Sequence, residues 1–321
     1  MNNIKISVKG REYEIPNSWD AVTPQAWLNF CHNLWLVETG ELSVGELRIR
    51  LLCDIMGWRW HKMRDDEAIA NLVVLSEQLT FPFRIQYPDN NAALQSLSDD
   101  DYRKAVRHEP DHLSIAAAPR LQQLDWHYQA DLCFVRQMVP VLTADGTDYD
   151  GYRAELHDGA LTLTLTALQY IHACEALDNR DGLHRLAAIL YAPQPYDAEQ
   201  AHELALRLRD VETNTLRAVR MNFQAVTNFL FTKTPFSLLT KFEHGSKTKS
   251  ITTTMGDALY DLCADGLGGY AEVEQLNVLT YLRILRKKTI DSVRQLHGMQ
   301  MDIARIANET GLPPSVITEI V

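Results

Sequence analysis

The sequence has few cysteines, and they do not form pairs. Five cysteines are spread over 321 residues, and no two stand in a CxxC arrangement. An odd number of widely spaced cysteines does not predict a disulfide framework, and without CxxC pairs a structural zinc site is not expected. We therefore expect buried free thiols in a reducing compartment. The five are Cys31, Cys53, Cys133, Cys174 and Cys263.

A long apolar segment is also missing. No run approaches the roughly 20 apolar residues that a membrane helix needs. The first residues, MNNIKISVKGREYEIP, do not contain the apolar region of a signal peptide. The sequence therefore predicts a soluble protein made in the cytoplasm, without membrane insertion.

An excess of positive charge is the third absence. The formal net charge is −11 and the sequence pI is near 5.5. Since phosphate binding needs a positive surface, this balance makes nucleic acid an unlikely general partner, while a local basic patch stays open. Hydrophobic residues make up 46% of the chain, enough for one large core or two medium ones.

Local patterns predict a mainly α (α+β) fold: helical bundles with two short β-hairpins and a C-terminal helical hairpin. Alternating apolar and polar residues over 4–15, with Gly10 in the turn, predict the first hairpin. A similar pattern around Asp145-Gly146 predicts the second within 135–152. The predicted helices cover about 24–35, 43–56, 65–79, 167–177, 183–191, 197–208, 214–231, 255–263 and 273–301.

Some helix ends are marked clearly. Thr23 is a predicted N-cap before Pro24, Thr166 starts a helical run, and Gly57 ends another. The helix over 65–79 has a predicted buried stripe interrupted by a small polar residue. The stripe is Ile69, Leu72, Val73 and Leu79, with Ser76 as the interruption. For residues 83–125 the sequence predicts short helices and connecting loops.

The chain shows signs of division. The predicted domains are 1–126 and 127–243, each a hairpin followed by helices, and a helical segment over 251–321. The small, polar and basic stretch over 244–251 is the best linker. Since the first two domains share their order of elements, an internal duplication is one explanation, and a common arrangement of hairpin and helix pair is the other.

Several short motifs match a known signature but lack the surrounding residues that the signature requires. His108-Glu109-Pro110-Asp111-His112 matches HExxH, but zinc ligation needs both histidines on one helix face, and Pro110 disfavours that helix. Asp145 to Gly151 has carboxylates without the spacing of a calcium loop, so a polar hairpin turn is favoured. Asp265 to Gly269 has no Lys-Ser/Thr after it, so a hinge is favoured over a phosphate loop. We therefore predict no catalytic residue, metal or cofactor.

The C-terminal segment 303–317, IARIANETGLPPSVI, has the spacing of a helix-turn-helix. Ala307 is small enough for a tight crossing, and Gly311 supplies the turn. A DNA-reading helix must offer Arg, Lys, Asn or Gln to the bases, whereas the second helix here carries one acidic and no basic residue. The pattern therefore favours a packing or partner-docking hairpin, whose apolar face is Leu312, Val316 and Ile320.

Four segments together resemble a family of uncharacterised proteins from prophages of Bacteroidetes-type bacteria. They are SWDAVTPQAWLNF, GELRIRLLC, GLHRLAAILYAP and LNVLTYLRILRKKT. The resemblance implies a product of the tail or virion assembly region with a structural or chaperone-like role. It also implies a bacterial host, in whose cytoplasm the protein would be made, and a virion or tail-like particle that could incorporate it. It brings no functional residues with it.

Three hypotheses follow. The first is a non-enzymatic phage- or injection-machine-type structural or assembly protein that binds other protein subunits or forms a homo-oligomer. Its expected surface anchors are Trp58, Trp60 and Phe83. The Trp58–Trp60 cluster can also stack on nucleobases, but its place after a helix end favours core or partner packing. The second is a DNA-binding regulator using 303–321, in which Arg283, Arg286, Lys287 and Lys288 contact phosphates. The third is an enzyme whose site is assembled from distant residues.

Overall fold

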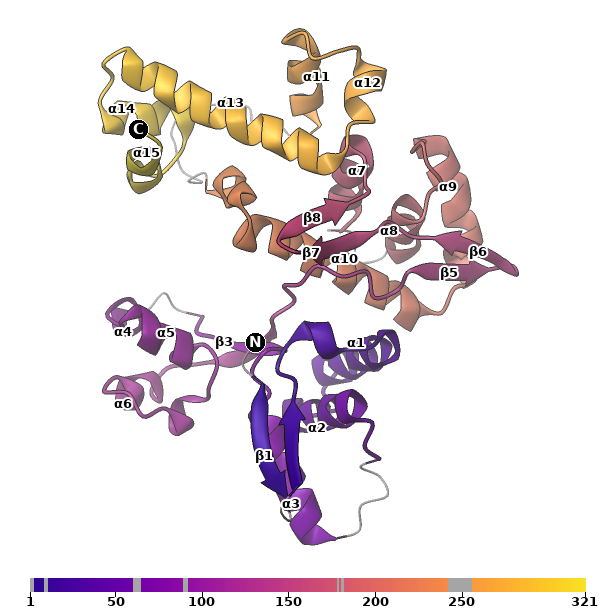
Figure 1. Ribbon diagram of the computed structural model, residues 1–321, viewed down its shortest axis with the longest axis vertical. Helices are drawn as coiled ribbons and strands as arrows, with labels where there is room; N and C mark the ends of the chain where they lie inside the picture. The colour runs from indigo at the N-terminus through magenta and orange to yellow at the C-terminus, as the bar shows by residue number, and fades with distance from the viewer. Residues whose placement is uncertain are drawn as a thin grey trace. The chain divides into compact units, whose positions relative to one another are not determined.

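A computed structural model describes residues 3–8, 11–59, 65–88, 92–177, 179, 182–241 and 256–321 (Figure 1). The chain divides into two compact units, Met1–Leu132 and Cys133–Val321, each with buried apolar clusters of its own. The first unit ends a few residues beyond the predicted boundary at 126, because the strand over 127–130 pairs with an earlier strand. The predicted linker over 244–251 lies outside the described residues.

The fold is mainly α with short β-hairpins, as predicted. Helices make up 59% of the residues and strands 12%. The described strands form four two-stranded antiparallel sheets: β1–β2, β3–β4, β5–β6 and β7–β8. The two predicted hairpins are β1–β2 and β5–β6, and the other two sheets were not predicted.

Strands β1 (Ile4–Val8) and β2 (Arg11–Ile15) form the first hairpin, in which Ile4 pairs with Ile15. The predicted turn residue Gly10 lies outside the described part. Ile15 is fully buried and joins a core cluster that the hairpin shares with the next helices.

Helix α1 (Pro24–Glu38) begins as predicted. The Thr23 hydroxyl accepts a hydrogen bond from the Ala26 N–H at 3.2 Å, which satisfies one of the free donors of the first turn. The short 3-10 helix η1 (Trp19–Ala21) precedes it. The ring of Trp19 lies edge-on to those of Trp27 and Phe30, at 5.6 and 5.2 Å, so an aromatic group anchors the start of the unit.

Helix α2 (Val44–Met56) is bounded by two local signals. A reciprocal capping box joins Ser43 and Glu46, and Gly57 ends the helix at a φ of +66°. Helix α3 (Asp66–Glu77) starts at its N-cap, Asp65.

The buried face of α3 differs from the predicted stripe. Leu72, Ser76 and Leu79 are buried, as their spacing of four and three residues allows. Ile69 and Val73 are instead exposed, at 44% and 37%. The helix packs on α2 with the Leu72–Ser76 side, so Ile69 and Val73 lie outside that contact.

Strands β3 (Phe83–Gln86) and β4 (His127–Ala130) pair although they are distant in sequence. The segment between them holds α4 (Ala92–Gln95), α5 (Asp99–Ala105), η3 (Pro110–His112) and α6 (Ala118–Leu121). The short helices were predicted and strand β3 was not. Buried side chains join this segment to the strands: Ile85, Tyr87, Ala105 and Leu121.

Two hairpins open the second unit. Strands β5 (Val141–Ala144) and β6 (Thr147–Asp150) are joined by Asp145-Gly146, and β7 (Ala154–His157) and β8 (Ala160–Leu163) by Asp158-Gly159. All four loop residues have φ between 48° and 78°, the twist that a two-residue hairpin needs. The second hairpin has no counterpart in the first unit, and the internal duplication stays a prediction.

Helices follow: α7 (Ala167–Leu177), α8 (Leu183–Leu190), α9 (Ala198–Arg207), the 3-10 turn η5 (Leu208–Asp210) and α10 (Thr213–Lys233). Thr166 caps α7 as predicted, since its hydroxyl accepts a hydrogen bond from the Gln169 N–H at 3.2 Å. Asn222 of α10 is fully buried and holds the chain that leads to β5. Its side chain donates to the Arg136 carbonyl and accepts from the Met138 N–H, each at 2.7 Å.

The C-terminal part comprises η6 (Pro235–Thr240), α11 (Asp257–Ala264), α12 (Tyr270–Glu274), α13 (Val278–Gly298), α14 (Ile303–Thr310) and α15 (Pro314–Ile320). The single helix predicted over 273–301 was wrong. It is divided at Asn277, whose side chain accepts from the Leu279 N–H at 3.0 Å and donates to the Leu163 carbonyl at 2.6 Å. Asn277 therefore caps a new helix and ties it to β8.

All five cysteines are free, as predicted. Cys31 and Cys53 are buried as predicted, whereas the predicted burial was wrong for Cys133, Cys174 and Cys263, which are partly exposed. Burial raises the pKa of the Cys31 thiol well above its ordinary value, so this thiol stays protonated. Within the described ranges, no helix is both long and apolar enough to cross a bilayer.

Candidate protein-docking surfaces

The expected aromatic anchors lie in or beside the core of the first unit. Trp58 is half-buried and packs on the cluster that contains Ile15 and Leu72. Phe83 is 2% exposed, with its ring 6.2 Å from that of Phe30. Phe83 therefore has no surface to offer a partner, because strand pairing turns it inward. Trp60 lies outside the described residues.

The apolar face of the C-terminal hairpin packs on its own chain. Leu312 and Val316 are 1% and 7% exposed, and Ile320 is partly buried. They form one cluster with Val293 of α13 and Leu238 of η6. This contact uses the face that was predicted to dock a partner.

The turn between α14 and α15 has the geometry that its spacing predicts. Asp302 caps α14, and Gly311 ends it at a φ of +72° with its N–H on the Ala307 carbonyl. The exposed positions of α15 are Pro314, Ser315, Thr318 and Glu319, and none of them is basic. A helix-turn-helix geometry is thus present, and its second helix offers no positive side chain to DNA.

The four basic residues of α13 do not share one environment. Arg283 and Lys287 are exposed, and Arg286 is partly buried. Lys288 is paired with Asp265, at the end of α11. Of the four residues that were expected to contact phosphates, Arg283 and Lys287 are therefore the two that are exposed and take no part in an ion pair within the described residues.

The HExxH segment is not a helix. Residues Pro110–His112 form a short 3-10 turn, and Glu109 has an extended backbone. The Glu109 carboxylate accepts a hydrogen bond from the Tyr128 hydroxyl on β4. Among the described residues, no cluster of three or more His, Cys, Asp or Glu is arranged to hold a metal.

Tyr128 also contacts a buried arginine that sequence reasoning did not single out. Arg48 of α2 is 6% exposed and donates to the Tyr128 hydroxyl at 3.3 Å. Its guanidinium lies 4.6 Å from the Tyr128 ring centroid and 5.7 Å from that of Phe83. Burial, and then the bond to Glu109, raises the pKa of Tyr128 to about 12. The linked side chains of Arg48, Tyr128 and Glu109 thus join α2, β4 and the segment between β3 and β4.

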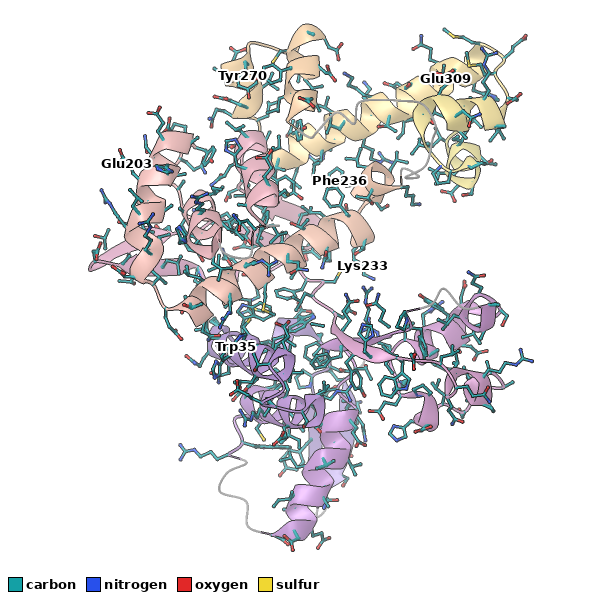
Figure 2. The ribbon with its side chains drawn as sticks, turned by 180° about the vertical axis from the view of Figure 1, so that it is seen from behind. Trp35, Glu203, Lys233, Phe236, Tyr270 and Glu309 are labelled. Carbon is teal, nitrogen blue, oxygen red and sulfur yellow. The ribbon has the colours of Figure 1, made fainter. Side chains whose placement is uncertain are left out.

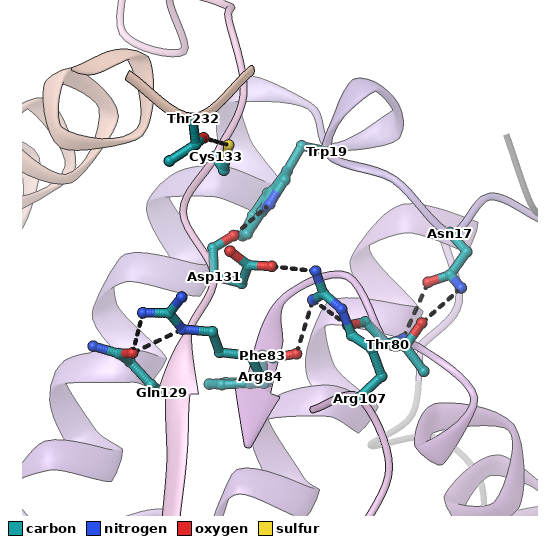
Figure 3. Close-up of polar contacts among 10 residues, drawn as sticks. All are labelled: Asn17, Trp19, Thr80, Phe83, Arg84, Arg107, Gln129, Asp131, Cys133 and Thr232. Carbon is teal, nitrogen blue, oxygen red and sulfur yellow. Dashed lines mark hydrogen bonds and ion pairs between the residues drawn. The ribbon is translucent and has the colours of Figure 1, made fainter. Parts of the chain in front are cut away.

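A second polar network joins the segment between β3 and β4 to β3, to η1 and to Asp131, which follows β4 (Figure 3). Arg107 donates to the carbonyls of Thr80 and Phe83 and pairs with Asp131 at 2.5 Å. The Trp19 indole N–H donates to the Asp131 carbonyl at 3.0 Å. Arg48 is linked to Glu109 through Tyr128, and Arg107 is paired with Asp131, so we assign both networks to folding and not to ligand binding.

Three large apolar residues of α3 are exposed. Ile69, Val73 and Val74 are 44%, 37% and 56% exposed. β-Branched residues are mediocre helix formers, so helix propensity does not explain them on a solvent-facing side. Clustered exposed apolar residues are typical of protein interaction sites. We call these three residues the α3 face. From the sequence, Ile69 and Val73 were predicted to be buried in the core.

Two tyrosines form an exposed patch on α11 and α12. The rings of Tyr260 and Tyr270 stack with centroids 4.8 Å apart and planes at 26° (Tyr270 is labelled in Figure 2). Tyr260 is 62%, Tyr270 37% and the nearby Leu267 45% exposed. We call Tyr260, Leu267 and Tyr270 the tyrosine patch. No periodic pattern marks it, because its members come from two short helices and the loop between them.

Comparison with known proteins adds no relative: neither a protein-family model, nor a curated protein, nor a solved structure matches the chain.

Proposed function

We propose that the chain is a non-enzymatic structural or assembly protein of a phage or an injection machine, a tail or virion component or an assembly chaperone. It acts by binding other protein subunits. The α3 face is the observation that carries this proposal, since Ile69, Val73 and Val74 leave aliphatic surface exposed to water. The resemblance of the sequence to prophage proteins indicates the class of machine.

The α3 face also limits the chemistry of the partner. Its three anchors offer no hydrogen-bond donor or acceptor, so the contacting surface must be apolar. The acidic residues of α3, Asp66, Glu67 and Glu77, lie at its ends and form a polar rim. The surface fits the anatomy of a small protein interface with an aliphatic centre.

The test is co-expression with the products of the neighbouring genes, followed by size-exclusion chromatography with light scattering. The variant Ile69→Gln/Val73→Gln/Val74→Gln should abolish a defined complex that the unmodified chain forms. Leu206→Gln on α9, a residue 49% exposed in the second unit, is the matched control and should keep it. Failure to form any defined complex, or an α3 variant that binds like the unmodified chain, contradicts the proposal.

The geometry of α14 and α15 supports one alternative, a DNA-binding regulator. The capped helix, the left-handed Gly311 and the second helix are the observation in its favour. The absence of positive side chains on α15 is against it. A gel shift over a salt series decides: specific binding that weakens as salt rises, and that Arg283→Ala and Lys287→Ala reduce, would favour the regulator.

A further inference from the structure

The surroundings of the tyrosine patch carry charge of one sign. Residues 256–282 include five carboxylates and no lysine or arginine. Asp261 follows Tyr260 on α11, and Glu274 lies one turn after Tyr270 on α12; Asp261 is exposed and Glu274 partly so. Exposed tyrosines edged by carboxylates form a surface that suits a cation, because the ring face and the carboxylates both attract positive charge.

The matching surface lies on the next helix. Arg283, Lys287 and Arg294 of α13 fall on one side of the helix, since their spacing of four and seven residues is close to whole turns. All three are exposed. Within the described ranges, neither Arg283 nor Lys287 takes part in an ion pair. We call Arg283, Lys287 and Arg294 the basic face.

The two surfaces do not satisfy each other within one chain. Lys288 already pairs with Asp265 and so ties the end of α11 to one side of α13. Lys288 points roughly 140° around the helix from Arg283, at about 100° per residue. The basic face is therefore directed away from the side that meets α11.

We propose that the chain binds a second copy of itself, with the basic face of one copy docked on the tyrosine patch of the next. Arg283 and Lys287 stack on Tyr260 and Tyr270, and Asp261 and Glu274 pair with the same cations. The occupant is a second copy because one chain carries both members of a complementary pair of surfaces. The contact joins two different surfaces, so it is head-to-tail and builds rings or open chains unless two copies exchange it reciprocally.

This inference deepens the proposed assembly role and rests on it. Self-association is the behaviour expected of a structural subunit, and its surfaces lie in the second unit, whereas the α3 face lies in the first. The two contacts can therefore be removed separately.

The test is a charge exchange in the full-length chain, measured by sedimentation velocity at low salt. Arg283→Glu/Lys287→Glu reverses one surface, and Asp261→Lys/Glu274→Lys reverses the other. Each variant alone should weaken self-association at least about tenfold, because like charges then face each other. An equimolar mixture of the two should associate again, since each surface finds an opposite one. Arg209→Glu/Lys233→Glu, at exposed cations elsewhere in the unit, is the control and should associate like the unmodified chain.

The outcomes separate this inference from the proposed function. A chain that stays monomeric at every concentration, a reversed variant that associates normally, or a mixture that does not recover would each overturn self-association. If the monomeric chain still forms a defined complex through the α3 face, the assembly role stands without it. Far-UV circular dichroism of each variant must match that of the unmodified chain, so that loss of folding is not read as loss of contact.

Discussion

Replacing Tyr128 with phenylalanine should destabilise the first unit without disturbing the second. The ring stays, so its contact with the Arg48 guanidinium at 4.6 Å is kept. The hydroxyl is lost, and with it the acceptor for Arg48 at 3.3 Å and the donor to Glu109. Arg48 is 6% exposed, and its Nε has no hydrogen-bond partner among the described residues, so the Tyr128 hydroxyl is not a redundant contact.

The size of the loss follows from the charges involved. A hydrogen bond to a charged group contributes about 1.5–3 kcal/mol, and a partner left buried and unpaired adds a desolvation cost. Water can reach the partly exposed Glu109 and reduce that cost. We therefore expect the free energy of unfolding to fall by about 1–2 kcal/mol for Tyr128→Phe.

Tryptophan fluorescence during denaturant unfolding isolates this effect. All six tryptophans lie in the first unit, whereas far-UV circular dichroism follows the helices of both units. The fluorescence midpoint should therefore fall, and the part of the circular dichroism transition due to the second unit should not move. Tyr102→Phe, at a side chain 48% exposed, is the matched control and should change the stability by less than about 0.5 kcal/mol. A Tyr128→Phe chain as stable as the control would refute the role given to the Arg48–Tyr128–Glu109 chain.

Three further outcomes are expected. Asn222→Ala should lower the stability of the second unit by about 2 kcal/mol, seen by circular dichroism and not by fluorescence, because it leaves the Arg136 carbonyl and Met138 N–H without their partner. Gly311→Ala should cost about 1 kcal/mol in thermal unfolding, since a φ of +72° is strained with a Cβ, while Gly298→Ala, with open space around its Cβ and a φ outside that region, should cost nothing. Burial raises the pKa of Tyr152, Tyr170 and Tyr191. Their neutral forms therefore stabilise the fold below about pH 10, and the urea midpoint should fall as pH rises above that value; a flat profile would contradict it.

Local signals were read correctly because their physics is local. Each of these signals depends on a few neighbouring residues. The structure confirms the N-cap at Thr23, the helix starts predicted near Ser43 and Thr166, and the turn at Gly311. The β7–β8 hairpin was missed although Asp158-Gly159 repeats the signal that located Asp145-Gly146. That signal was available in the sequence.

Other features depend on partners that are distant in sequence. Phe83 was predicted to be a surface anchor, yet pairing with β4 buries it. The period of α3 predicted one apolar stripe without showing how much of it α2 covers, so Ile69 and Val73 were placed in the core. No sequence pattern singled out Arg48, because its contacts are with Tyr128 and, through it, Glu109, which lie far along the chain.

Because β3 and β4 pair, the segment between them is an insertion between two neighbouring strands. Gln86 lies opposite His127, so the chain leaves the strand pair and returns to it at one point. A two-residue turn could bridge that point, but it would remove Val106, whose carbonyl accepts a hydrogen bond from the Ile85 N–H at 2.9 Å. The same excision would remove Glu109, the carboxylate linked to Arg48 through Tyr128, and Arg107, which neutralises Asp131. Residues 87–126 are thus not needed to connect the two strands, but they supply core contacts and charges on which the first unit depends.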